Sequence, residues 1–180
     1  DGGNDLLALI NYLGTFSPDR QPALDRFLLE PARQLPGRRF VVAGSRYPDE
    51  IAWPRNVDRI EHLPPGEHAS FYSRQRFTLN VTRADMIALG WSPSVRLFEA
   101  AACAAPVISD GWDGLSSFFP QDEAIVVART TDDVVRALTE MPEARRKAMA
   151  EAARARIAPH TGRARARELV AHLRHAARNG

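Results

Sequence analysis

The sequence predicts an α/β fold in which a parallel β-sheet is covered by helices on both faces. Short apolar segments of strand length alternate with longer segments whose apolar residues recur at helical spacing. Strands that are apolar throughout are typical of parallel sheets buried on both faces. A chain of 180 residues is long enough for one domain with a sizeable core. In such sheets ligands bind beyond the carboxyl ends of the strands, so the loops there are the expected place for a site.

Six strands are expected, each a short apolar run bounded by Gly, Pro or polar residues. They span residues 10–14, 39–43, 57–63, 77–82, 106–110 and 124–128. The segments that follow four of them, residues 14–20, 63–65, 83–94 and 110–115, are expected to be loops at one edge of the sheet. All the residues suspected on chemical grounds fall in or beside these loops.

Helices are expected between the strands and at the end of the chain, because apolar residues recur there three and four positions apart. They span residues 22–34, 66–75, 131–141, 142–157 and 162–177, together with a helix that begins near residue 92. Met149, Ala153 and Ile157 form one apolar stripe, and Leu169 and Leu173 form another. These stripes are expected to pack against the sheet domain or against a further domain, leaving the arginines in water.

The helix that begins near residue 92 carries the most informative residue, Glu99, in an otherwise Ala-rich apolar segment. Ser92 is the expected cap and Pro93 the first helical residue, so the helix would present free N–H groups suited to a phosphate. From Ser94 to Glu99 the helix rises about 7–8 Å, which is roughly the distance from a nucleotide's phosphates to its ribose. Glu99 is therefore expected to accept hydrogen bonds from ribose hydroxyls, with an Arg96–Glu99 ion pair as the structural alternative.

Several function classes are disfavoured. There is no Gly-x-Gly-x-x-Gly after the first strand, no Walker loop, and no clustered His or Cys, so neither a dinucleotide cofactor nor a bound metal is expected. The chain has a single cysteine, Cys103, which excludes a disulfide framework and makes a reducing cytoplasm the expected location. Cys103 itself is expected to be a buried apolar residue. No apolar run approaches the length of a membrane span. The sequon at Asn80 lies in a predicted buried strand and is discounted.

Charge is distributed unevenly along the chain. Residues 141–180 contain ten Arg and Lys against three Glu, whereas the first 140 residues contain 14 basic and 19 acidic residues. A basic segment of this kind could contact nucleic acid or an anionic membrane surface. The solvated face of amphipathic helices is the favoured interpretation, so no nucleic-acid partner is expected.

Six short motifs occur together in this chain. They are Tyr12-Leu13-Gly14-Thr15, Asn80-Val81-Thr82-Arg83-Ala84-Asp85-Met86, Gly90-Trp91-Ser92-Pro93-Ser94, Arg96-Leu97-Phe98-Glu99-Ala100-Ala101-Ala102, Pro106-Val107-Ile108-Ser109-Asp110 and Gly114-Leu115 with Phe118-Phe119. Over about residues 9–160 the chain resembles the C-terminal, nucleotide-sugar-binding domain of GT-B glycosyltransferases, most of all the CgeB-like (spore maturation protein) group. The resemblance implies a Rossmann-like domain that binds the diphosphate and ribose of an activated sugar.

The resemblance assigns expected roles by position. Glu99 resembles the Glu that binds the ribose, Ser94 and Arg96 lie where the diphosphate meets the helix, and Leu63 resembles the segment beside the nucleobase. Arg20 lies near the place of a basic residue on the donor phosphates, although a surface arginine at a helix start is an equal alternative, and Gly14 belongs to the same ligand-side loop. A nucleotide-diphosphate sugar is the expected substrate, without a metal, because Arg can bind the leaving diphosphate bidentately.

The residues expected near the sugar are less clearly defined. Many retaining GT-B enzymes have a second Glu eight positions before the ribose Glu, and Trp91 occupies that position here. The sugar would then be bound through Asp85 or the Trp91 ring, and either stereochemical outcome stays open. Arg83 is an even choice between a substrate role and a structural pair with Asp85 or Glu99. The family usually has Gly at the position of Ala104, so a left-handed conformation there would cost about 1 kcal/mol.

The expected organisation is a linker over residues 1–8, a Rossmann-like domain over 9–160 and a C-terminal amphipathic helix over 161–180. In GT-B enzymes the acceptor site and the usual catalytic base belong to an N-terminal domain, so we expect an excised half or part of a longer protein, inactive alone, whose acceptor is unknown. No catalytic residue is assigned. Half of a nucleotide-sugar 2-epimerase and a non-catalytic nucleotide-sensing or partner-binding module are the alternative functions.

Overall fold

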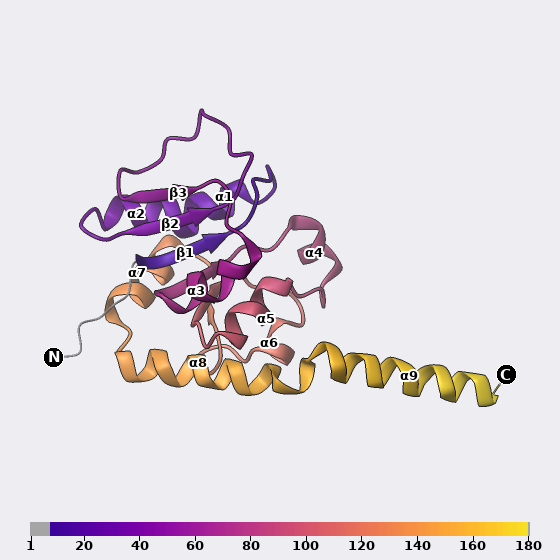
Figure 1. The fold of residues 1–180 in the computed structure, drawn as a ribbon. Coiled ribbons are helices and arrows are strands. Elements are labelled where there is room, and N and C mark those ends of the chain that lie inside the picture. Colours follow the sequence, from indigo (N-terminus) through magenta and orange to yellow (C-terminus); the bar gives the residue numbers. More distant parts are fainter. Residues whose placement is uncertain (1–7, 180) are drawn as a thin grey trace.

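The structure is a computed structural model that describes residues 8–179, and in this part of the chain six parallel strands form one sheet (Figure 1). The strands are β1 (Ala8–Leu13), β2 (Phe40–Ala43), β3 (Val57–Ile60), β4 (Gln75–Asn80), β5 (Val107–Ser109) and β6 (Val126–Val127). Their order is β3-β2-β1-β4-β5-β6, and each adjacent pair is parallel. The order reverses between β1 and β4, which creates the crevice in which such sheets bind ligands. The predicted α/β fold is confirmed.

Helices cover both faces of the sheet. They are α1 (Gln21–Leu24), α2 (Glu30–Gln34), α3 (His68–Ser73), α4 (Ala84–Leu89), α5 (Val95–Ala102), α6 (Leu115–Phe118), α7 (Thr131–Glu140), α8 (Glu143–Ile157) and α9 (Gly162–Asn179). A π-helical segment, Asp25–Leu29, joins α1 and α2 into one helical run. Pro31 explains it, because proline has no N–H and its ring would collide with the carbonyl of Phe27 in a regular α-helix.

Two apolar layers lie on opposite faces of the sheet. Phe40 and Val42 of β2 belong to the layer beneath α1, α2 and α7, whereas Val41 and Ala43 belong to the layer beneath α3, α5 and α8. On β1, Asn11 is fully buried and donates to the Phe71 carbonyl of α3 at 2.8 Å. Polar residues of β1 and β4 therefore lie on the α3–α5 face, where they find hydrogen-bond partners.

Two predicted boundaries need correction. Residue 8, assigned to a linker, is the first residue of β1, and residues 1–7 of that linker lie outside the described part of the chain. The segment 83–94, predicted to be a loop, contains α4. The Ala84 N–H at its start is capped by the Asp19 carboxylate at 3.0 Å. A cap supplied by a residue 65 positions away is invisible to local sequence patterns, which explains the error.

The start of α5 also differs from the prediction. Its cap is Ser94, whose hydroxyl accepts from the Arg96 N–H, and the helix begins at Val95. Ser92 and Pro93 lie before the helix and do not cap it. Ser94 is the residue that combines extended backbone angles with a hydroxyl directed at the second helical N–H, which is the geometry of a cap.

The end of α5 shows the strain that the sequence suggests. Ala104 has φ 50°, and the Ala104 and Ala105 N–H groups donate to the carbonyls of Ala101 and Ala100 at 3.0 and 2.9 Å. This pair of backbone hydrogen bonds ends many helices, usually with glycine at the left-handed position. The turn is therefore retained with alanine, at a cost of about 1 kcal/mol. Cys103 lies at this turn and is only half-buried, which corrects the prediction of a buried residue.

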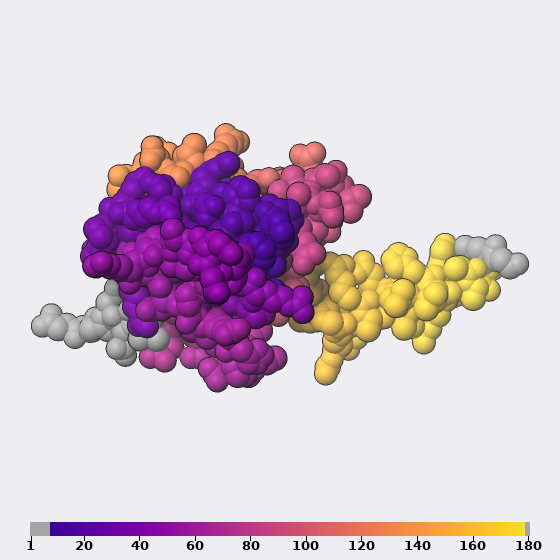
Figure 2. All heavy atoms as spheres, turned by 90° about the horizontal axis from the view of Figure 1, so that it is seen from above, coloured from indigo at the N-terminus to yellow at the C-terminus, as the bar shows by residue number. Residues whose placement is uncertain are grey.

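The two C-terminal helices differ in their packing. On α8, Met149 and Ala153 are buried against the domain, as predicted for that stripe. On α9, Leu169 and Leu173 are 59% and 61% exposed. Figures 1 and 2 show α9 extending away from the body of the domain. Among the described residues, no helix is long and apolar enough to cross a membrane.

Candidate functional site

A cleft of about 370 Å³ lies at the carboxyl ends of the strands, beside the reversal of strand order. Its volume is within the range of small-molecule sites. Residues from the segments after β1, β2, β3 and β4, from α3 and from the start of α5 line it. They are Leu13, Gly14, Thr15, Arg20, Gly44, Ser45, Glu61, His62, Leu63, Tyr72, Arg83, Ser94, Val95, Arg96 and Glu99. All six residues predicted to bind the nucleotide are in this lining, and so is Arg83.

The floor of the cleft is formed by the backbone of Gly14 and Gly44. A Cβ atom added to Gly44 would lie 2.0 Å from the Gly14 carbonyl oxygen, and Gly44 has φ 153°. A Cβ atom on Gly14 would lie 2.6 Å from the Tyr12 hydroxyl and 3.0 Å from Arg96 Nη2. The Tyr47 hydroxyl donates to the same Gly14 carbonyl at 2.8 Å. Glycine at both positions therefore lets two backbone segments meet and leaves room for the Arg96 side chain.

The start of α5 faces the cleft, because Ser94, Val95 and Arg96 all line it. Ser94 satisfies the Arg96 N–H. The unpaired N–H groups of a helix's first turn and the positive end of its dipole attract anions. This end of α5 is therefore the side of the cleft that is best suited to an anion.

Three arginines line the cleft, and within residues 8–179 none of them forms an ion pair with a carboxylate, although Arg20 is near enough to Asp19 to help lower the pKa of that carboxyl. Arg20 is buried, its Nη2 donates to the Thr15 carbonyl at 2.5 Å, and its Nε has no partner among the described residues. Arg83 is exposed and forms no side-chain hydrogen bond or ion pair within the described part of the chain. Arg96 donates to Asn80 Oδ1 at 3.2 Å and stacks on the Tyr12 ring at 5.1 Å. Burial of Arg20 rules out the alternative of a solvated surface arginine.

Glu99 is half-buried and accepts a hydrogen bond from the Tyr72 hydroxyl at 3.3 Å. Burial, together with the nearby Glu99 carboxylate, raises the pKa of Tyr72, so its hydroxyl stays protonated and able to donate. The alternative Arg96–Glu99 pair is not formed, because Arg96 turns to Asn80 instead. Arg83 likewise pairs with neither Asp85 nor Glu99 in the described residues. One oxygen of Glu99 is thus left without a partner from the described residues.

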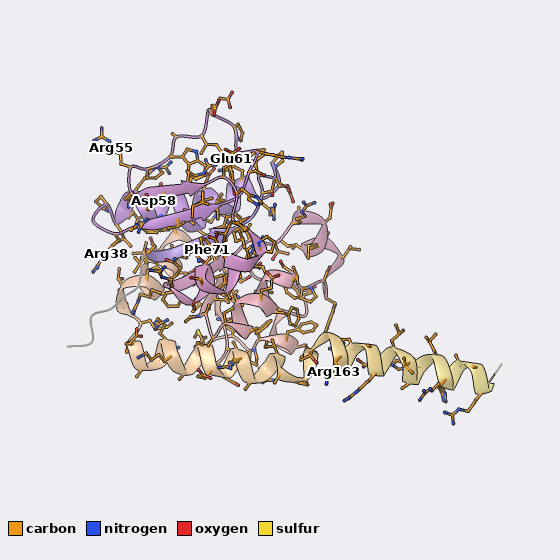
Figure 3. All side chains as sticks on the ribbon, in the orientation of Figure 1. Arg38, Arg55, Asp58, Glu61, Phe71 and Arg163 are labelled. Atoms are coloured by element: carbon orange, nitrogen blue, oxygen red, sulfur yellow. The ribbon has the colours of Figure 1, made fainter. Side chains whose placement is uncertain are left out.

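The segment after β3 forms one side of the cleft. Glu61, His62 and Leu63 line the cleft here, and Figure 3 shows Glu61 just beyond β3. Leu63 is also fixed by its carbonyl, which lies 3.3 Å from His68 Nε2. This segment offers backbone groups, one apolar side chain and one carboxylate to a ligand.

Two of the three residues predicted to lie near the sugar are outside the cleft lining. Asp85 is exposed on α4. Trp91 is 64% exposed, has φ 53°, and packs its ring over Gly114, where an added Cβ would meet Trp91 Cδ2 at 2.6 Å. The segment after β5, also predicted to be ligand-side, lines a separate hollow of about 260 Å³.

Residues that the sequence did not identify complete the site. Tyr72 holds Glu99, and a buried polar group formed by Asn80, Thr82, Ser109 and Asp110 lies behind Arg96. Burial raises the pKa of Asp110, while hydrogen bonds from Thr82 and Ser109 act in the opposite direction. The signal that could have found this group is the presence of Asn, Ser and Asp at the ends of otherwise apolar strands. Within residues 8–179, no cluster of three or more His, Cys, Asp or Glu side chains is placed to hold a metal ion.

The fold and this cleft define a Rossmann-like domain of the GT-B glycosyltransferase type. The chain matches the sequence model of the glycosyl transferase-like family over residues 20–171, and it belongs to that family. Among curated proteins, no sequence matches it. The family match does not distinguish the CgeB-like group, which stays an expectation.

Solved structures share the fold at low sequence identity. Sucrose-phosphate synthase from Thermosynechococcus elongatus is 16% identical with a TM-score of 0.74, over 97% of this chain and 47% of that one. Trehalose 6-phosphate synthase from Burkholderia multivorans is 14% identical with a TM-score of 0.70, over 94% and 43%. T4 phage BGT in complex with its UDP-glucose substrate is 14% identical with a TM-score of 0.62, over 81% and 43%. The chain thus spans less than half the length of these structures.

Proposed function

We propose that this chain is the donor-binding half of a glycosyltransferase and that its cleft binds a nucleotide-diphosphate sugar. The observation that carries the proposal is the set of three arginines, Arg20, Arg83 and Arg96, which line one cleft and form no ion pair with a carboxylate of the described residues. The buried Arg20 Nε also has no hydrogen-bond partner there, and a bound diphosphate would supply both an acceptor and negative charge. Similar structures bind such donors: T4 phage BGT was solved with its UDP-glucose substrate and an Anabaena protein, HepE, with UDP-glucose.

The proposed placement of the ligand follows the lining of the cleft. The diphosphate lies against the start of α5 and the arginines, the ribose against the free oxygen of Glu99, and the base against the segment at Leu63. Transfer breaks the bond between the anomeric carbon of the sugar and the diphosphate oxygen, and it forms a bond from the acceptor oxygen to that carbon. The acceptor proton passes to a base, and the diphosphate leaves with the electron pair. The arginines stabilise this departing negative charge.

We further propose that the acceptor and the base that deprotonates it belong to an N-terminal domain, as in other GT-B enzymes. The exposed apolar stripe of α9, formed by Leu169, Val170 and Leu173, supports the proposal, because this stripe has no cover in the described part of the chain. A second domain packed on α9 would remove it from water. A cytoplasmic location is part of the proposal and is supported by the single unpaired cysteine.

Titration of the chain with UDP, GDP, ADP and CMP tests the proposed function. We expect one nucleoside diphosphate to bind selectively, as measured by calorimetry or by a rise in melting temperature. Selective binding fits a transferase and also a nucleotide-sugar 2-epimerase. Incubation with the matching nucleotide sugar distinguishes the two, because only the epimerase would form an epimerised product. Failure of all four nucleotides to bind would contradict the proposal and favour a partner-binding module.

Glu99→Gln is expected to weaken nucleotide binding by about 1.5–3 kcal/mol, because a charge-assisted bond to the ribose is lost. The fold should survive, since the glutamine carbonyl can still accept from the Tyr72 hydroxyl. Affinity is measured by calorimetry and folding by circular dichroism, with Glu151→Gln on the exposed face of α8 as the matched control. Unchanged affinity in a folded Glu99→Gln protein would remove Glu99 from the ribose site.

Phosphate binding is expected to be cationic and independent of metal ions. Nucleotide affinity should be unchanged by a chelator and should fall as salt concentration rises, because ion contacts near the surface are screened. The measurement is the dissociation constant at several salt concentrations, with and without EDTA. A strict requirement for magnesium or manganese would overturn this expectation.

A further inference from the structure

Four polar side chains form a buried group directly behind Arg96. Asn80 and Ser109 are completely buried, and Thr82 and Asp110 nearly so. Asn80 ends β4, Ser109 ends β5, and the other two residues follow these strands. Buried polar side chains are retained when every member has a partner, so their hydrogen bonds can be followed atom by atom.

The hydrogen bonds of this group have a definite direction. Both side-chain oxygens of Asp110 accept: Oδ2 from the Thr82 N–H at 2.9 Å, and Oδ1 from the Thr82 hydroxyl at 2.7 Å and from the Ser109 hydroxyl at 3.2 Å. A hydroxyl has one proton, so both hydroxyls use theirs on Asp110. Their lone pairs are then left to accept from Asn80 Nδ2, which lies 2.9 Å from Ser109 Oγ and 3.2 Å from Thr82 Oγ1.

The orientation of the Asn80 amide follows from this direction. Because its NH₂ group must face the two hydroxyls, its carbonyl oxygen faces Arg96 Nη1 at 3.2 Å. The reversed amide would direct NH₂ at the guanidinium and leave both hydroxyls facing a carbonyl with no proton to donate. Arg96 is also held on the Tyr12 ring. The Asn80 carbonyl and the ring thus hold the guanidinium where it lines the cleft.

We propose that Asp110 and Asn80 are positioning residues that act on the diphosphate through Arg96. Asp110 fixes the direction in which the two hydroxyls donate, and the hydroxyls fix the orientation of the Asn80 amide. The amide in turn holds Arg96 toward the ligand. Neither Asp110 nor Asn80 is part of the cleft lining. The proposal rests on the proposed function, in which Arg96 contacts the diphosphate.

Asp110→Asn tests the relay with little change of shape. Its carbonyl can still accept from the Thr82 N–H, but its NH₂ then faces the two hydroxyls and makes them donate toward Asn80. The Asn80 amide is thereby driven to turn its NH₂ toward Arg96. We expect affinity for the nucleoside diphosphate that binds in the titration to fall about tenfold, while affinity for its nucleoside stays the same.

A double-mutant cycle with Arg96→Gln separates positioning from a purely structural role. If Asp110 acts through Arg96, Asp110→Asn should have no further effect on diphosphate affinity once Arg96 is replaced. Equal losses with and without Arg96, or equal losses for the nucleoside and the diphosphate, would overturn the proposal. Asn80→Ala, which removes the acceptor for Arg96 without touching Asp110, should behave in the same way and serves if Asp110→Asn does not fold.

The same cycle distinguishes failure of this inference from failure of the proposed function. If Arg96→Gln alone leaves diphosphate affinity unchanged, then Arg96 does not contact the phosphates, and the proposed function is wrong at this residue. If Arg96→Gln weakens binding but Asp110→Asn and Asn80→Ala do not, then the proposed function stands and the positioning role is wrong.

Discussion

With nucleotide sugars, the 180-residue chain is expected to bind the donor and to transfer no sugar at a measurable rate. Transfer needs an acceptor oxygen at reacting distance and a base to take its proton. Positioning of this kind contributes up to about 7–11 kcal/mol, so its absence leaves turnover negligible. The cleft offers cations, the ribose candidate Glu99, which already accepts from Tyr72, and the exposed Glu61 and His62 after β3. Glu61 and His62 are not part of a recognisable catalytic motif.

The measurement is the release of nucleoside diphosphate and of glycosylated product from a panel of nucleotide sugars. Retained affinity for the diphosphate is the control, since it shows that the inactive chain is folded. Sustained turnover would contradict the prediction and would place the acid and base within this chain. Asp85 and Asp113, two exposed carboxylates near the carboxyl edge of the sheet, would then be replaced first, followed by the buried Asp110.

Gly44→Ala is expected to be the most damaging single substitution near the cleft. The new methyl group would lie 2.0 Å from the Gly14 carbonyl oxygen, at a residue whose φ of 153° already disfavours a side chain. Overpacking and backbone strain together should lower the free energy of unfolding by roughly 3 kcal/mol. Nucleotide affinity should fall as well, because Gly14 would be displaced from beside Arg96.

Chemical denaturation and nucleotide titration measure the two effects. Gly37→Ala is the matched control, because a Cβ atom there would meet nothing within 4 Å. A Gly44→Ala protein as stable as the Gly37→Ala protein would show that the two backbone segments can separate without cost. It would contradict the conclusion that close contact between Gly14 and Gly44 requires glycine.

Much of the fold follows from local patterns. The strands were predictable because a strand buried on both faces must be apolar throughout, as Phe40–Ala43 is. The approach of Gly14, Leu63 and Arg83 to the start of α5 was predictable because parallel strands bring their carboxyl ends to one edge. The distance along α5 from Ser94 to Glu99 was predictable from the rise per residue of a helix alone.

The remainder depends on contacts between distant residues. Tyr72 and Glu99 are 27 positions apart, and Asp19 caps α4 from 65 positions away. Trp91 was expected near the sugar from its sequence position. Its φ of 53° and its packing on Gly114 place the ring outside the cleft lining, and nothing in the local pattern shows this.

The backbone floor of the cleft has a consequence for how donor preference can diverge. At Gly44 an added side chain would collide with the backbone of Gly14, so we expect no other residue to be tolerated there. Glu61 and His62, by contrast, line the cleft but are exposed, so their side chains can be exchanged without disturbing the core. Directed evolution toward a different nucleobase should therefore accumulate its changes in the segment after β3, while the phosphate side is inherited unchanged.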